Sequence, residues 1–125
     1  MTIPELTETY YFHDSAIAEI THDDRLHQLV ITIEFCFWAQ EAFKEGMPET
    51  GLIKLVFHEV EDFDCDGLPG EIDYFSILDA SADNNKLTLS ILDDFHNSFY
   101  ELYVVSPAVD FIVIEEENGQ SQPGR

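Results

Sequence analysis

The clearest pattern along this chain is an alternation of apolar and polar residues, which is typical of β-strands. It is strongest over Leu26–Trp38, where every second residue from Leu29 to Phe37 is apolar and the opposite face includes Glu34. A period of two places these apolar side chains on one face of a strand. Because the stretch is long for one strand, we expect a bend or bulge near its end, at Phe35–Trp38.

The same alternation predicts six further strands, separated by turns rich in Gly, Pro, Asn and Asp. One of them, Glu71–Ala82, also fits a helical stripe, but the Asn-containing turn that follows it favours a hairpin. Gln40–Glu45 is compatible with one helical turn, and we expect the first ten residues to be a polar lead-in. The six strands are Ser15–His22, Leu52–Val60, Glu71–Ala82, Lys86–Leu92, Phe99–Ser106 and Val109–Glu115.

About seven short strands predict a mainly β fold, either an antiparallel sandwich or a curled sheet, with room for one short helix. An α+β fold is the alternative. The length of 125 residues suits a single domain that covers residues 1–125. Residues 117–125 are polar and contain Gly and Pro, so we expect a flexible tail there.

The charge of the chain is strongly one-sided. Twenty-six Asp and Glu face five Lys and Arg, which gives a net charge of -21. This field repels nucleic acid and anionic membranes, and it attracts basic proteins and divalent cations. Solubility or adaptation to salt is the other explanation of such a charge. We therefore expect a basic protein partner, no nucleic acid and no membrane, and a monomer or at most a weak homodimer.

Cysteine usage and the absence of long apolar runs bear on the compartment. Cys36 and Cys65 follow no short-range spacing motif, and we expect both to be free thiols in a reducing compartment. No apolar run approaches the roughly 20 residues of a membrane-spanning helix, and no signal-peptide pattern is present. These features predict a soluble cytoplasmic protein.

One acidic loop follows the pattern of a calcium-binding loop. Asp62, Asp64 and Asp66 alternate, Gly67 follows, and Asp73 is the twelfth residue counted from Asp62. The pattern is similar to an EF-hand loop, in which oxygen ligands alternate, a glycine makes the turn and an acid closes the site. The short closing acid, a proline at the eighth position and strand-like flanks depart from that loop. The alternatives are a Ca2+ or Mg2+ site and a merely solvated loop; no other cofactor is expected.

No catalytic signature is recognisable. The chain lacks a phosphate-binding glycine-rich loop, a nucleophile elbow and paired-cysteine motifs. In an extended Phe12–Ser15 segment, Asp14 would face away from His13 and could not orient it as in a catalytic triad. With 26 acids almost any carboxylate geometry is available, so carboxylate pairs give no usable signal. We therefore predict a binding protein with no catalytic residue; an enzyme that uses His13 or a pair of carboxylates is the alternative.

Acidic residues are concentrated in one stretch of the chain. Between Glu59 and Asp79 there are eight acids and no Lys or Arg, so we expect the basic partner to bind there. An exposed Trp or Tyr beside acids is a frequent contact residue, and Trp38 and Tyr100 each share one face of the alternation with polar neighbours. The predicted contact residues are Glu59, Glu61, Asp62, Asp64, Asp66, Trp38 and Tyr100.

The stretch from Phe12 to Ile33, which starts with Phe-His-Asp-Ser, resembles small uncharacterised acidic bacterial proteins. In those proteins the motif begins a first strand, with Ile17 and Ile20 inward, and a strand rich in Leu and Ile follows. Some of them are similar to immunity proteins of toxin systems. The resemblance implies an all-β or α+β domain without assigned enzyme activity, and it assigns no functional residues. Together with the charge, it makes an immunity-type protein that neutralises a basic toxin one form of the expected binding protein. A divalent-cation-binding domain and a structural domain are the alternatives.

Overall fold

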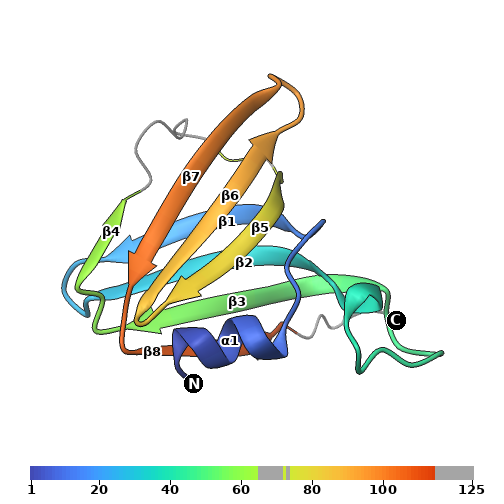
Figure 1. Cartoon of the computed structure of the whole chain (residues 1–125), viewed down its shortest axis with the longest axis horizontal. Coiled ribbons are helices and arrows are strands. Elements are labelled where there is room, and N and C mark those ends of the chain that lie inside the picture. Colours follow the sequence, from blue (N-terminus) through green and yellow to red (C-terminus); the bar gives the residue numbers. More distant parts are fainter. Residues whose placement is uncertain (65–71, 73, 115–125) are drawn as a thin grey trace, which may run out of the picture.

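The alternation in the sequence produces strands along most of the chain. The computed structural model describes residues 1–64, 72 and 74–114, in which eight antiparallel strands form one open, curled sheet (Figure 1). Within the same residues there are one α-helix, α1 (Ile3–Thr9), and one 3-10 turn, η1 (Phe37–Ala39). The predicted mainly β fold with one short helix is confirmed. The strands are β1 (Ala16–Asp23), β2 (Gln28–Cys36), β3 (Thr50–His58), β4 (Asp62–Asp64), β5 (Phe75–Asp83), β6 (Lys86–Asp93), β7 (Ser98–Val105) and β8 (Ala108–Val113).

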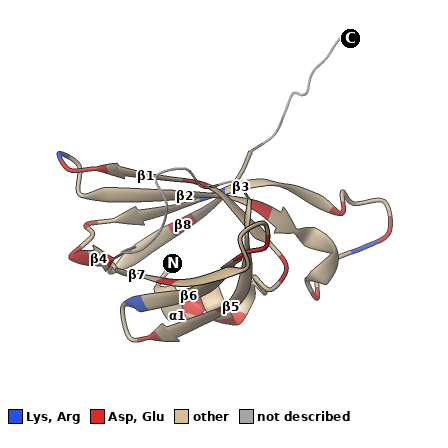
Figure 2. Cartoon of the chain, turned by 90° about the horizontal axis from the view of Figure 1, so that it is seen from above, with Lys and Arg blue, Asp and Glu red and all other residues tan. Residues whose placement is uncertain are grey.

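The sheet consists of two halves that are joined by a short pairing of β1 with β5. Each strand is antiparallel to its neighbours in the order β4-β7-β6-β5-β1-β2-β3-β8. The contact between β1 and β5 is short, because only Ala16 and Ile17 pair there, with Ser76 and Phe75. Figures 1 and 2 show the two halves as layers that lie over each other. The architecture is therefore the curled sheet of the prediction rather than a sandwich of two separate sheets.

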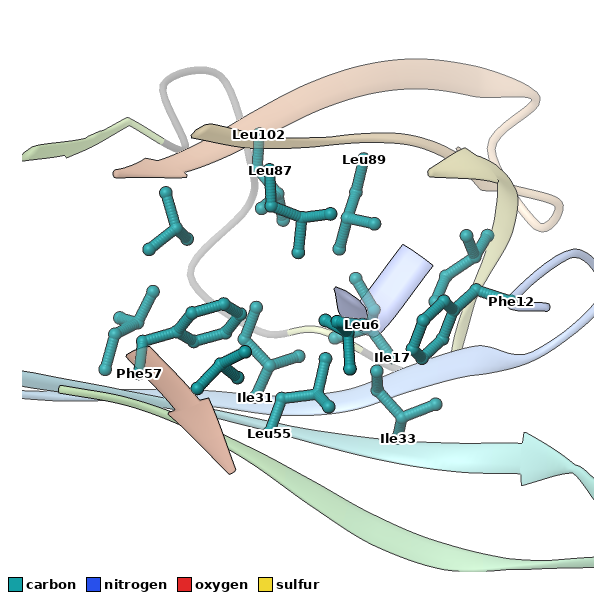
Figure 3. Close-up of a cluster of buried hydrophobic side chains, with 14 of the residues drawn as sticks. Leu6, Phe12, Ile17, Ile31, Ile33, Leu55, Phe57, Leu87, Leu89 and Leu102 are labelled. Carbon is teal, nitrogen blue, oxygen red and sulfur yellow. The ribbon is translucent and has the colours of Figure 1, made fainter. Parts of the chain in front are cut away.

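The inward faces of the two layers form one apolar core (Figure 3). In β2 the alternate residues from Leu29 to Phe35 are buried, as the period of two predicts. Complete burial of a large apolar side chain stabilises a fold by about 1.5–3 kcal/mol. Alternate residues are buried in β3 and β6 as well. They are Ile53, Leu55 and Phe57 in β3, and Leu87, Leu89 and Ile91 in β6.

Most of the first ten residues form helix α1 (Ile3–Thr9), so the predicted polar lead-in is wrong. Thr2 and Glu5 make a capping box: the Thr2 hydroxyl accepts the Glu5 N–H, and the Glu5 carboxylate accepts the Thr2 N–H at 2.8 Å. The hydrogen bond from the Thr2 backbone, followed by that of its side chain, lowers the pKa of Glu5. The helix buries Ile3 and Leu6 completely. Burial of two apolar side chains outweighs the polar composition of this segment.

The helix lies beside the edge strand β8. The N-terminal amine of Met1 donates to the Val109 carbonyl at 3.0 Å, and the Val109 N–H donates to the Met1 carbonyl at 2.8 Å. Beyond the end of α1, the ring of Tyr10 stacks on that of Phe111, with centroids 3.8 Å apart. A helix beside an edge strand protects it from pairing with other chains. Neither helix in the described part of the chain is long and apolar enough to cross a membrane.

The predicted bend at the end of the second strand is present. Strand β2 ends at Cys36, and the chain turns through η1, where the Trp38 N–H donates to the Glu49 carbonyl. Residues 40–45 lie in a loop and form no helix: the Phe43 N–H donates at 3.1 Å to the carbonyl of Gln40, whose backbone is extended. The side-chain amide of Gln40 donates to the carbonyls of Tyr11 and Cys36, at 2.7 and 2.9 Å.

Candidate functional site

Two turns that are far apart in the sequence meet at one end of the sheet. The β1–β2 turn (residues 24–27) and the β3–β4 connection (residues 59–61) lie side by side, because the Val60 N–H donates to the His27 carbonyl at 2.8 Å. Both are on the left of Figure 1, next to β4. This region, here called the acidic end, exposes Asp24, Glu59, Glu61 and Asp62.

The acidic end contains a cleft of about 470 Å³. Three carboxylates and two imidazoles line it together with apolar side chains, and none of its described lining residues is Lys or Arg. Arg25 belongs to the same turn but does not line the cleft. The lining residues are His22, Asp24, His27, Val60, Glu61, Asp62 and Phe63.

Strand β7 holds the carboxylates of the β3–β4 connection in place. The Glu61 N–H donates to the Val105 carbonyl at 2.9 Å, and Asp62 then pairs with Val105 in the sheet. One carboxylate oxygen of Asp62 accepts the Tyr103 hydroxyl at 3.0 Å. Backbone held by a neighbouring strand loses little further entropy on binding, which favours affinity.

Aromatic rings lie beside these acids. The ring centroids of His22 and Phe63 are 4.5 Å apart, and Nδ1 of His22 is 3.2 Å from a carboxylate oxygen of Asp24. The cleft therefore combines negative charge with flat, partly apolar surface. Such a combination suits long cationic side chains, which place an apolar stem on a ring and a charged head on an acid.

The structure brings together only part of the predicted contact set. Glu59, Glu61 and Asp62 lie together at the acidic end, and Asp64 follows on β4. Asp66 lies outside the described residues. Trp38 is 49 % exposed but lies on η1, at the opposite end of the sheet (Figure 1).

Tyr100 does not lie on the exposed face of β7, where its polar neighbours led us to expect it. It belongs to the inward face of β7, where its ring stacks on that of Phe75 with centroids 5.9 Å apart. Its neighbour Phe99 faces outward and is 68 % exposed. Leu102 and Val104, two and four residues further on, are both buried, and their spacing from Tyr100 would have identified the inward face.

The predicted calcium loop falls largely outside the described residues, which include neither Asp66 nor Asp73. Asp62 and Asp64 lie on β4 two residues apart, so they share one face of a strand. Among the described residues no three His, Cys, Asp or Glu side chains form a group that could hold a metal ion. The metal site stays a prediction.

The Phe12–Ser15 segment is a turn, so the expectation that Asp14 faces away from His13 is wrong. Asp14 has a φ of 72°, and its carboxylate is 3.2 Å from Nδ1 of His13. Aspartate tolerates this left-handed backbone better than most residues do. The buried Ser15 hydroxyl accepts the Cys36 N–H at 3.0 Å, which gives Ser15 a structural role. Cys36 is a free thiol, as predicted, and Cys65 lies outside the described residues.

Every ion pair between described residues joins a histidine to an aspartate. None of these described pairs uses a lysine or an arginine, and at the acidic end the carboxylate that takes part in such a pair is that of Asp24, with His22. The four pairs are His13–Asp14, His22–Asp24, His58–Asp110 and His96–Asp93.

Asp93, at the end of β6, organises the β6–β7 turn. One carboxylate oxygen accepts the N–H groups of Phe95 and His96 at 3.1 and 3.2 Å, and the other lies 2.7 Å from Nδ1 of His96. Burial alone raises the pKa of Asp93, because the side chain is only 4 % exposed. The hydrogen bonds and charge of His96, with the Phe95 N–H, outweigh burial and lower the pKa of Asp93 below its ordinary value.

We expect Asp93→Asn to lower the unfolding temperature at pH 7 and to have no effect in strong acid. A lowered pKa in the folded state contributes stability above the ordinary value of about 3.9, and this contribution disappears as pH falls through the folded value. Thermal unfolding of both proteins, followed by circular dichroism between about pH 2 and 7, measures the difference. Asp79→Asn, at an exposed position, is the control. A constant difference over this range would contradict the prediction.

The groups that line the cleft at the acidic end offer negative charge, imidazole nitrogens and apolar surface. Together they suit cationic side chains, because carboxylates bind the charged head in hydrogen bonds strengthened by charge. Comparison with known protein families, characterised proteins and solved structures finds no match for this chain, so these residues carry the functional argument.

Proposed function

We propose that this protein binds a basic protein through its acidic end, and that this partner is a toxin which it neutralises in the manner of an immunity protein. The observation that carries the proposal is the cleft of about 470 Å³, in which Asp24, Glu61 and Asp62 lie beside Phe63 and no described lining residue is Lys or Arg. The resemblance of the Phe12–Ile33 stretch to small acidic bacterial proteins supports the second part.

Long-range charge supports the choice of a basic partner. A net charge of -21 attracts cations and raises the rate at which a basic protein meets this surface. Figure 2 displays the contrast between the many acidic positions and the few basic ones. Salt screens such attraction, with a Debye length of about 8 Å at physiological ionic strength. Binding of the partner should therefore weaken steeply as salt is added.

Apolar residues at the acidic end support affinity as well as encounter. Leu26 is exposed at the tip of the β1–β2 turn, and Val60 and Phe63 line the cleft. Interfaces take most of their binding energy from a few well-packed groups that exclude water, while a charged rim directs encounter. The acidic end offers both kinds of group within one small region.

We expect Glu61→Gln combined with Asp62→Asn to weaken binding of the basic partner about tenfold or more, because both carboxylates line the cleft. Glu41→Gln combined with Glu45→Gln is the matched control, since it removes the same charge from an exposed loop elsewhere. The measurement is calorimetry at low salt against each basic protein encoded beside the gene of this chain.

The same variants test the two parts of the proposal separately. If no neighbouring basic protein binds at low salt, the proposed function is wrong. An equal loss in both double variants would mean that diffuse charge, rather than the cleft, causes binding. For the immunity role, co-production of this protein should restore growth of cells that make the toxic partner. The cleft variant should restore growth less well than the control variant.

A further inference from the structure

The outer surface of the β5-β6-β7 layer carries a second hollow, away from the acidic end. It is a groove of about 370 Å³, near the lower limit of the roughly 300–1,000 Å³ that ligand pockets occupy. Phe99 lines it and is 68 % exposed, more than any other described large apolar residue except Phe95. The lining residues are Leu78, Ser90, Ile91, Phe99, Tyr100 and Glu101.

Strand geometry explains why apolar residues are exposed here. In β7 the inward face takes alternate residues, so Phe99 and Glu101 face outward, opposite Leu92 and Ser90 of β6. Leu78 reaches the groove through a β-bulge: Ile77 pairs with Ile91 and Asp79 with Ser90, which leaves Leu78 without a partner in the ladder. Bulges redirect side chains and are frequent beside functional sites.

One acidic residue lines this groove, and two others lie on the same face of the layer. Glu101 lines it, and Asp79 pairs with Ser90, another lining residue. Asp94 reaches the same face, because its carboxylate accepts the Ser76 hydroxyl at 3.1 Å. The lysine of this layer, Lys86, is bound elsewhere: its ammonium lies 4.4 Å from the ring centre of Tyr103, at the other end of β6.

We propose that this groove receives an apolar side chain of the basic partner, and that lysine or arginine residues on either side of that side chain bind Asp79, Asp94 and Glu101. The inference rests on the proposed function and adds to it, because it gives the partner a mixed apolar and basic surface. Interfaces commonly place an aromatic contact at the centre and charged groups around it.

Charge complementarity selects this occupant over the others that an apolar groove could take. A second copy of the chain would also carry a net charge of -21, and nucleic acid is an anion, so the acidic rim disfavours both. The groove and the acidic end lie along the same strand, since Phe99 is the second residue of β7 and Val105 ends it beside Asp62. A strand rises about 3.4 Å per residue, so Phe99 and Val105 lie roughly 20 Å apart. One protein–protein interface of standard size spans this distance.

The test uses three synthetic peptides at low salt. In the first, Leu-Phe is flanked on each side by two lysines; in the second, Ser-Ser replaces Leu-Phe; in the third, glutamates replace the lysines. We expect only the first to shift the amide resonances of Leu78, Phe99 and Glu101 in NMR spectra. Phe99→Ser should weaken its binding about tenfold. Phe95→Ser is the matched control, because Phe95 is exposed on the same hairpin without lining the groove.

The outcomes separate this inference from the proposed function. Equal binding of the Leu-Phe and Ser-Ser lysine peptides, shifts confined to other surfaces, or an unchanged affinity of Phe99→Ser would overturn the groove assignment. In each case a neighbouring basic protein that binds the acidic end would still support the proposed function. Conversely, the first peptide could bind in the groove while no basic protein encoded beside the gene binds this chain. This result would support the groove as a binding site and would contradict the proposed function.

Discussion

We expect Phe35→Ala to lower the free energy of unfolding by about 3–5 kcal/mol. Phe35 is completely buried, and its ring contacts four other aromatic rings, with centroid distances between 5.2 and 6.0 Å. These rings come from the segment after α1, from η1 and from β8. Loss of the Phe35 ring therefore opens a cavity where the N-terminal segment meets the sheet. Its four neighbours are Tyr10, Phe12, Phe37 and Phe111.

Urea unfolding followed by circular dichroism measures this effect. Domains of this size have a free energy of unfolding of about 5–15 kcal/mol, so a loss of this size is a large part of the total. Phe35→Leu therefore provides a milder second variant. Phe95→Ala is the control, because Phe95 is 91 % exposed and its loss should cost no more than about 0.5 kcal/mol. A similar effect of Phe35→Ala and Phe95→Ala would show that the aromatic cluster contributes little to stability.

The sequence predicts the central strands well because each of them has one buried face. In β2 and β3 the alternation identifies the inward residues correctly, for example Ile31 and Leu55. The hairpin between β5 and β6 also follows from local chemistry, since Asn84 has a φ of 54° that asparagine tolerates. Where one face of a strand is buried and the turn that follows is formed by neighbouring residues, the sequence pattern is sufficient to predict the structure.

Elements that depend on distant contacts are less visible in the sequence. Strand β4 has three residues, too few to show a period, and it exists because Phe63 pairs with Val104 more than 35 residues away. Helix α1 has only Ile3 and Leu6 as buried positions, and its strongest signal is the capping box at its start. In both elements, tertiary packing decides a conformation that the local pattern leaves open.

Only part of the acidic end was predicted, because the rest of it depends on contacts between distant segments. Glu59, Glu61 and Asp62 are close in sequence, so their proximity follows from the chain itself. His22, near the end of β1, and Asp24, in the β1–β2 turn, enter the cleft from a distant part of the sequence, which only the tertiary fold brings near. The groove around Phe99 depends on the face of a strand, and a shift of one residue exchanges inside and outside.

At the corner between β7 and β8, a single hydroxyl connects several elements. Ser106 is completely buried, and its oxygen lies 2.6 Å from the His58 carbonyl and 2.8 Å from the Ala108 carbonyl. The same oxygen accepts the Ala108 N–H, and the Ser106 N–H donates to the Asn85 carbonyl. The corner thus joins β3, the β5–β6 turn and β8.

We expect Ser106→Ala to lower the free energy of unfolding by about 1–3 kcal/mol, because it leaves buried backbone groups without the hydroxyl that pairs with them. Urea unfolding measures the loss, and Ser81→Ala, at an exposed position of β5, is the control. The β3–β4 connection begins directly after His58, so Ser106→Ala should also weaken binding at the acidic end, even at temperatures where the variant is fully folded. Stability equal to that of Ser81→Ala, with unchanged binding, would show that this corner does not hold the acidic end in place.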